Sequence, residues 1–414
     1  MTERLSTALL EIQVQNNQFL IYSTTEAVAK LDDILPEPRS AVRQQLLKAV
    51  GESPLSDFVL EQLGAELQEK QEFQSEVPST PLCSLPGYED TEALATRLLS
   101  DFQSLPWRYL LMVSIPGAAA DPVLGAFVDD RVPVSDSLSI KRWKESDAGV
   151  SHELPKENLF GFLTPYAAGL TAGSTYLCEQ TEGYVGPYGV TTPLFDYSLK
   201  LRGLLGIALA LRLWEPGGSR YATPRRKSII VLRETDGQWQ YQGTHHLSYE
   251  DTEGIDSLRL FSRVSELESP EQALFVRKDW AQVQIAFQSG RKGDAIVRAG
   301  QWLFDSYCGT NELLKFVQAA VSLEILLGDK AATDLVGLGE LLANRCAYLI
   351  GKTRSQRDEI LRDFRQIYET RSKIVHRGHS RLTNEDLERL SKLRWMCSRV
   401  IQEELRLLQA EADS

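Results

Sequence analysis

An arginine and a histidine near the end of one predicted helix are the residues of this sequence best suited to chemistry. Arg371 and His376 lie in the segment RQIYETRSKIVHRGHS, just before Gly378. An arginine presents a planar fork of donors that fits a phosphate and stabilises charge developing on it. A histidine takes a proton from a ribose 2′-hydroxyl, or gives one to a departing 5′-oxygen, near neutral pH. The pair therefore suits cleavage of RNA, because DNA lacks the attacking hydroxyl.

The spacing of this pair does not by itself bring the two side chains together. In an ideal helix, residues five apart are separated by about 140° around the axis and about 7.5 Å along it. The two groups can flank one groove if the last turn loosens towards Gly378, or if a second copy of the helix packs across from it. A purely structural explanation stays open, because a histidine in the last turn of a helix is favoured electrostatically.

Three nearby residues are candidates for supporting roles. Glu324 lies in an otherwise apolar helix and either orients Arg371 or His376, or forms a structural ion pair. Tyr368 lies three residues before Arg371 on the same face, where it stacks on a base or packs in the core. Ser372 bonds a phosphate or, equally, a helix carbonyl four residues earlier.

Basic residues are concentrated around the pair. Residues 351–381 hold nine Lys and Arg against four Asp and Glu. These side chains either track an RNA backbone, with release of its counterions, or form a solvated helix face. The candidates for RNA contact are Arg362, Arg365, Lys373, Arg377 and Arg381.

Helices must position these residues, and apolar residues recur at helical spacing throughout the C-terminal third of the chain. Glycines fall between successive segments, as C-terminal caps do, and Thr383 with Asp386 makes a capping-box start for the last helix. Short connections imply antiparallel neighbours, so we expect a helical bundle over residues 269–414. The predicted helices are Pro270–Ser289, Ala295–Tyr307, Asn311–Leu327, Leu335–Ile350, Ser355–Val375 and Asn384–Gln409.

The N-terminal two thirds of the chain has a different pattern of apolar residues, prolines and glycines. Residues 1–88 indicate helices, at 24–35 and from Ser53 to about Glu69, followed by a proline-rich and serine-rich linker over 70–88. Residues 89–268 indicate a mixed α/β region with a helix over 197–214. The predicted strands are 108–116, 159–166 and 226–234, with a hairpin turn at Asp236-Gly237. The fold class is therefore a multidomain α+β protein: a mixed α/β region, then an all-α bundle.

Charge and composition narrow the function. The 414 residues carry a net charge of −12, with ordinary hydrophobic and charged fractions for a globular protein. Residues 1–290 hold 25 Lys and Arg against 39 Asp and Glu, whereas residues 291–414 hold 20 against 18. The N-terminal region is thus too acidic to bind nucleic acid broadly.

The absence of several sequence motifs excludes other classes of protein. The sequence has no complete P-loop, no GxSxG and no HExxH motif, and its five histidines offer little for a metal site. We expect no metal and no cofactor. Five cysteines without a CxxC motif, no signal-peptide core and no apolar run long enough to span a bilayer predict a cytoplasmic protein that does not enter the membrane.

Three motifs of the C-terminal region resemble the Apea-like branch of the HEPN superfamily. They are an E-x-L-L element at Glu324–Leu327, an R-x-A-x-L-L helix at Arg345–Ile350, and a Y-x-x-R-S-x-I-V-H-x-G helix end at Tyr368–Gly378. Ile350 stands where leucine is common. The resemblance runs from Leu303 to Gly378 and says nothing about residues 1–270.

This resemblance implies an R-x4-6-H ribonuclease motif with Arg371 and His376 as the functional pair. It also implies a homodimer in which two motifs face one cleft, and a role in antiphage defence, abortive infection or toxin-type growth arrest. We therefore expect a metal-independent endoribonuclease that cleaves RNA. Its N-terminal region would sense a phage-derived or nucleotide trigger, restrain the nuclease or select the RNA. The alternatives are a non-catalytic RNA- or nucleotide-binding HEPN module and a purely structural dimerisation bundle.

Overall fold

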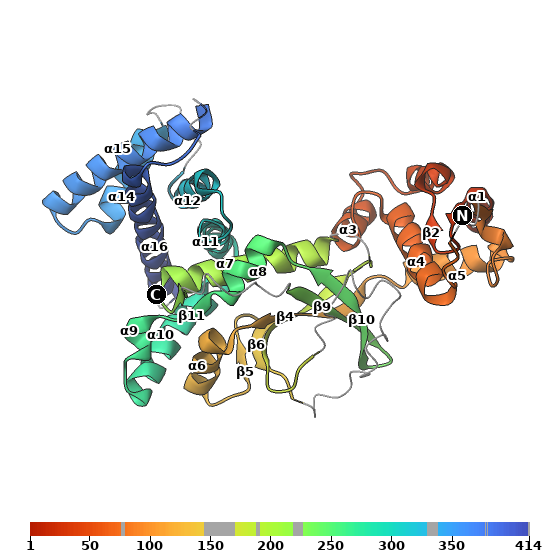
Figure 1. Cartoon of the computed structure of the whole chain (residues 1–414), viewed down its shortest axis with the longest axis horizontal. Helices are drawn as coiled ribbons and strands as arrows, with labels where there is room; N and C mark the ends of the chain where they lie inside the picture. Colours follow the sequence, from red (N-terminus) through yellow and green to blue (C-terminus); the bar gives the residue numbers. More distant parts are fainter. Residues whose placement is uncertain are drawn as a thin grey trace.

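The parts of the molecule follow one another along its long axis. The computed structural model describes residues 1–75, 79–144, 170–187, 191–217, 227–328, 338–376, 378 and 380–412. Figure 1 shows the N-terminal helices at one end, a sheet in the middle and the C-terminal helices at the other end. A mixed region containing sheets followed by a helical region confirms the predicted order of fold types.

Short helices dominate the N-terminal part. Here α5 begins beyond residue 88 yet packs against α1, and Ser6 Oγ lies 2.9 Å from Thr91 Oγ1. The small sheet has the strand order β2-β1-β3. The elements are α1 (Thr2–Glu11), β1 (Gln13–Gln15), β2 (Phe19–Leu20), η1 (Tyr22–Thr24), α2 (Glu26–Ala29), η2 (Lys30–Ile34), α3 (Ala41–Ala49), α4 (Pro54–Lys70), β3 (Thr80–Pro81), η3 (Leu82–Ser84) and α5 (Thr91–Gln103).

One predicted helix of this part is wrong. The segment 24–35 is not continuous, because it divides into the short elements η1, α2 and η2. Its Asp32 carboxylate accepts hydrogen bonds from the backbone N–H groups of Leu55 and Ser56, both at 3.0 Å. These groups belong to the first turn of α4, where N–H groups lack partners within the helix. The helical run is thus broken where Asp32 binds the start of α4, a segment more than twenty residues away in the sequence. In contrast, the helix predicted from Ser53 is confirmed as α4.

A six-stranded antiparallel sheet forms the middle of the molecule, in the order β10-β9-β4-β7-β6-β5. The predicted strands 108–116 and 226–234 are confirmed as β4 and β9. Asp236 and Gly237 connect β9 to β10 with φ angles of 52° and 74°, as the predicted hairpin requires. The predicted strand 159–166 lies outside the described residues. The strands are β4 (Trp107–Ile115), β5 (Arg131–Pro133), β6 (Leu138–Arg142), β7 (Thr175–Gly183), β9 (Ser228–Thr235) and β10 (Gln238–His246).

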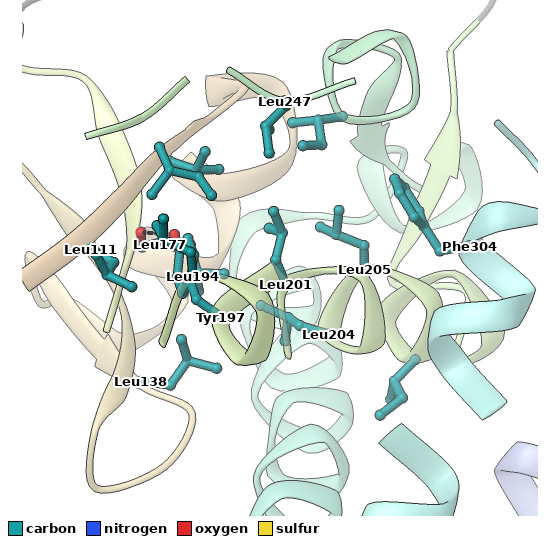
Figure 2. Packing of buried hydrophobic residues seen from close by; sticks show 14 of the residues in the cluster. Leu111, Leu138, Leu177, Leu194, Tyr197, Leu201, Leu204, Leu205, Leu247 and Phe304 are labelled. Atoms are coloured by element: carbon teal, nitrogen blue, oxygen red, sulfur yellow. Dashed lines mark hydrogen bonds between the residues drawn. The ribbon is translucent and has the colours of Figure 1, made fainter. Parts of the chain in front are cut away.

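Helix α7 (Thr192–Ala210) joins the sheet to the C-terminal helices. Figure 2 shows its side chains reaching Leu177 of the sheet at one end and Phe304 of α11 at the other. The Tyr197 hydroxyl donates a 2.8 Å hydrogen bond to the Leu177 carbonyl. A Cβ on Gly206 would lie 1.7 Å from the Gly300 carbonyl oxygen, so the two helix backbones touch. The middle and C-terminal parts consequently share one continuous core.

Smaller elements complete the middle region around this helix. Helix α6 packs against β11 and against α10 of the C-terminal part. The short pair β11-β8 forms a sheet of its own. These elements are α6 (Gly117–Phe127), β8 (Trp214–Pro216), α8 (Tyr249–Asp256), β11 (Leu258–Leu260) and α9 (Ser262–Ser265).

The C-terminal part is helical, as predicted. The predicted capping box is confirmed, since the Thr383 N–H donates to the Asp386 carboxylate at 3.1 Å and the Asp386 N–H to Thr383 Oγ1 at 3.2 Å. Gly378 has a φ of 63°, the left-handed conformation expected after a helix end. The helices are α10 (Ser269–Gln288), α11 (Gly290–Asp305), α12 (Glu312–Leu327), α14 (Leu338–Ile350), α15 (Arg354–His376) and α16 (Asn384–Ala412).

Candidate active site at the end of helix α15

Helix α15 carries both residues of the predicted pair and packs in the bundle against α12, α14 and α16. Its buried residues Ile360, Phe364 and Ile367 recur at intervals of three and four, which places them on one side of the helix. Arg371 follows Ile367 by four residues and continues this inner side. The amphipathic pattern therefore turns Arg371 towards the bundle.

Arg371 meets a carboxylate from a distant part of the sequence. Its Nη2 lies 3.1 Å from Glu324 Oε1 and 3.4 Å from Glu324 Oε2, and the two side chains are 24% and 21% exposed. The Nε atom of Arg371 is buried and has no hydrogen-bond partner among the residues that the structure describes. Glu324 thus orients the guanidinium and leaves a donor unused. The Arg371 side chain is 24% exposed, so part of it remains accessible to an anion.

Tyr368 completes this cluster from the inner side of α15. Its hydroxyl donates a 3.0 Å hydrogen bond to Glu324 Oε1, and its ring stacks on Phe364 with centroids 4.8 Å apart. Burial, followed by the negative charge of Glu324, raises the pKa of Tyr368 well above its usual range. The ring is held by the bundle, so Tyr368 acts on Glu324 and is not free to stack on a base.

His376 lies on another side of the same helix. Helix α15 remains helical through His376, so the turn that joins Arg371 to His376 is not loosened. Helix geometry then separates His376 from Arg371 by about 140° around the axis, and the histidine is exposed. Within one chain, the structure brings Arg371, Glu324 and Tyr368 together and leaves His376 apart from them.

The exposed side of α15 gathers polar and basic residues around His376. Arg365, Ser372 and His376 lie within about 20° of a common line along the helix, and all three are exposed. Arg365 also lines a surface hollow of about 720 Å³ on this side of the helix. The hollow is lined by Arg354, Ser355, Asp358, Leu361, Arg362 and Arg365. Three arginines against one aspartate make this hollow positive, which suits a phosphate backbone.

Arg354 is a residue of this surface that the sequence analysis missed. The signal was present, because Arg354, Arg365 and His376 are spaced by eleven residues. Eleven residues are close to three full turns, so the three side chains fall on nearly the same line.

The remaining basic candidates differ in their surroundings. Lys373 and Arg381 are exposed. Arg377 lies outside the described residues. Arg345 of the second HEPN-like motif donates a 2.9 Å hydrogen bond to the Leu327 carbonyl, and so satisfies a backbone group at the end of α12.

A buried polar network fastens the C-terminal half of α15 to α16. The Thr370 hydroxyl donates a 3.0 Å hydrogen bond to Asp386, and Arg389 donates a 2.9 Å hydrogen bond to the same carboxylate oxygen. Burial alone would raise the pKa of Asp386, but hydrogen bonds from Thr383, Thr370 and Arg389 outweigh it and hold the pKa well below its usual range. The network positions the helix end that carries the candidate pair.

Comparison with known proteins adds no family to these observations. No protein-family model, no curated protein and no solved structure matches the chain. Among the described residues, no group of three or more His, Cys, Asp or Glu side chains is arranged to hold a metal ion. No described helix is both long enough and apolar enough to cross a membrane. The resemblance to HEPN domains therefore stays a prediction that depends on the motif residues.

Proposed function

We propose that this chain is an endoribonuclease that cleaves RNA without a metal ion, with Arg371 and His376 as its acting pair in a HEPN-like bundle. The observation that carries the proposal is the end of α15. There, Glu324 orients a partly exposed arginine, and an exposed histidine continues the line of an arginine-lined hollow. We propose antiphage defence or toxin-type growth arrest as the setting, by analogy with the resembling family.

The chemistry follows from the two side chains. His376 in its neutral form takes the proton of a ribose 2′-hydroxyl, and the 2′-oxygen attacks the adjacent phosphorus. The bond from phosphorus to the 5′-oxygen breaks, and the leaving oxygen takes its proton from the His376 imidazolium that the first proton transfer formed. The products are a 2′,3′-cyclic phosphate and a 5′-hydroxyl. Arg371 stabilises the charge on the non-bridging oxygens as it develops.

The geometry of one chain requires a second copy for this reaction. Arg371 and His376 diverge on α15, so one phosphate cannot meet both of them on a single helix. A second chain whose α15 end packs across the first would supply the missing partner. Val375, next to His376, is 46% exposed, which offers apolar surface for that contact. The proposed enzyme is therefore a homodimer with Arg371 of one chain facing His376 of the other.

A second candidate is a non-catalytic module that binds RNA through the same residues. The divergence of Arg371 and His376 on one helix favours it, provided that the chain stays monomeric. Such a module would bind RNA along the arginine-lined hollow without releasing products.

Incubation of the purified chain with end-labelled RNA in the presence of EDTA tests the proposal. We expect cleavage that survives chelation, yields 2′,3′-cyclic phosphate ends, and falls at least a hundredfold in His376→Ala and in Arg371→Ala. The matched controls are His246→Ala on β10 and Arg406→Ala on α16, which should cleave like the wild type. Binding without products would support the module. Full activity of His376→Ala, or equal cleavage of DNA, would contradict the mechanism.

A further inference from the structure

The central sheet has a second face that the ribonuclease proposal does not use. Side chains of a strand alternate between the two faces of its sheet, and directly opposed residues share a face. The register pairs Ser139 with Cys178 and Gln180 with Leu110. These residues therefore lie on one face, whereas Leu111 and Leu177 lie on the face that packs against α7 (Figure 2).

This second face carries a cavity of about 260 Å³, just below the usual size range of small-molecule sites. Trp143 and Trp239 contribute indole rings to it, from the end of β6 and from β10. Arg131 and Lys141 are directly opposed on β5 and β6 and contribute two positive charges. The full lining is Leu110, Arg131, Ser137, Ser139, Lys141, Trp143, Cys178, Gln180 and Trp239.

The charge of this lining differs from that of its surroundings. The described residues that line the cavity include two cations and no carboxylate, although residues 1–290 as a whole are strongly acidic. Two other cavities of the N-terminal and middle regions contain carboxylates, Asp57 and Glu61 in one and Asp251 in the other. Salt screens charges beyond about 8–10 Å, so the two nearby cations determine what this cavity attracts.

The positions of the polar groups indicate how a ligand would be held. The Lys141 ammonium lies 5.3 Å from the centroid of the Trp143 ring, and Arg131 Nε donates a 3.3 Å hydrogen bond to Ser139 Oγ. Trp143 is buried and Trp239 is only partly buried, so Trp239 offers an aromatic face beside the cations. A cation near an accessible aromatic face binds a ligand that is both flat and anionic. Hydroxyl and amide groups, from Ser137 and Gln180, are available for the edge of a base.

We propose that this cavity binds a nucleoside monophosphate, with the base stacked on Trp239 and the phosphate held by Arg131 and Lys141. Base stacking on an aromatic side chain and a charge-assisted contact to phosphate are the two interactions that nucleotides offer together. The volume accommodates a single nucleotide unit and not a strand. The proposal does not depend on the ribonuclease, because no residue of α15 lines the cavity.

Calorimetric titration of the full chain with AMP, GMP, CMP and UMP tests this assignment. We expect at least one of them to bind with a micromolar to millimolar Kd, and its nucleoside and inorganic phosphate to bind at least tenfold more weakly. Trp239→Ala and Arg131→Gln should each weaken binding roughly tenfold. Arg131 is exposed, so its replacement tests the site even if Trp239→Ala fails to fold.

Two matched variants serve as controls, Trp395→Ala and Arg406→Gln, both on the surface of α16. Trp395 is 42% exposed, and the Arg406 side chain is 65% exposed. Neither change should alter nucleotide binding. The proposal is wrong if no monophosphate binds, if the nucleoside binds as tightly as the nucleotide, or if Arg131→Gln leaves the Kd unchanged. Binding of single-stranded RNA on this face without binding of any mononucleotide would also overturn it.

Discussion

The divergence of Arg371 and His376 on helix α15 leads to a prediction about mixed dimers. The helix remains regular through His376, so the two Cα atoms are about 9 Å apart and their side chains point about 140° away from each other. Glu324 holds the guanidinium on the inner side, while His376 is exposed. If RNA is cleaved, the acting arginine and histidine must then come from different chains.

To test this, two variants that should each be inactive alone, Arg371→Ala and His376→Ala, are combined in mixed dimers. A symmetric dimer has two composite sites, each with an arginine from one chain and a histidine from the other. In a mixed dimer one of these sites is intact and the other lacks both residues. Equal amounts that exchange at random give half mixed dimers, so the mixture should recover about one quarter of the wild-type rate.

The assay compares initial rates of cleavage of labelled RNA by each variant alone and by the co-refolded mixture. Mixed dimers purified through two different affinity tags should reach about half of the wild-type rate. Size-exclusion chromatography checks that each variant still dimerises. A mixture that stays as inactive as its components, although mixed dimers are present, would refute the composite site. A monomeric wild type that cleaves RNA would refute it as well.

Three further predictions concern the packing that supports the site. Gly206→Ala places a Cβ 1.7 Å from a backbone oxygen of α11 and should lower the free energy of unfolding by more than about 3 kcal/mol. The matched control is Gly125→Ala on α6, which has open space around it and should be neutral or stabilising in the same thermal melts. Glu324→Gln removes the charge opposite the half-buried guanidinium of Arg371 and should lower the free energy of unfolding by about 1–3 kcal/mol. A melting temperature equal to that of the wild type would argue against a stabilising ion pair. Asp386→Asn should lower the melting temperature at pH 7. The difference should shrink as the pH falls below about 4, because a carboxyl with a lowered folded-state pKa loses its stabilising contribution as it is protonated. A difference as large at pH 2 as at pH 7 would contradict this.

The helices of the bundle were predictable because their signals are local. Apolar residues at intervals of three and four, together with caps such as Thr383 with Asp386, depend only on the geometry of one helix. The structure reproduces all six predicted helices of this part, with shifts at their ends. The Asp236-Gly237 turn was predictable for the same reason, since both residues tolerate a positive φ.

Non-local contacts determined what the sequence pattern did not reveal. The segment 24–35 has the spacing of a helix, yet its Asp32 is bonded to the start of α4 and the helix is broken. The strand order of the central sheet likewise joins segments far apart in the chain. No local pattern specifies such pairings, because they depend on which apolar faces meet when the chain collapses.

The candidate sites show the same division. The sequence alone identified Arg371, His376 and the basic segment around them, because residue type and helical spacing limit the chemistry that a helix end can perform. Only the tertiary structure decided that Glu324 would face Arg371, that His376 would remain outside this cluster, and that Trp239 and Arg131 would line one cavity. Periodicity follows from the backbone of a single segment, whereas the neighbour of a side chain follows from the packing of segments distant in sequence.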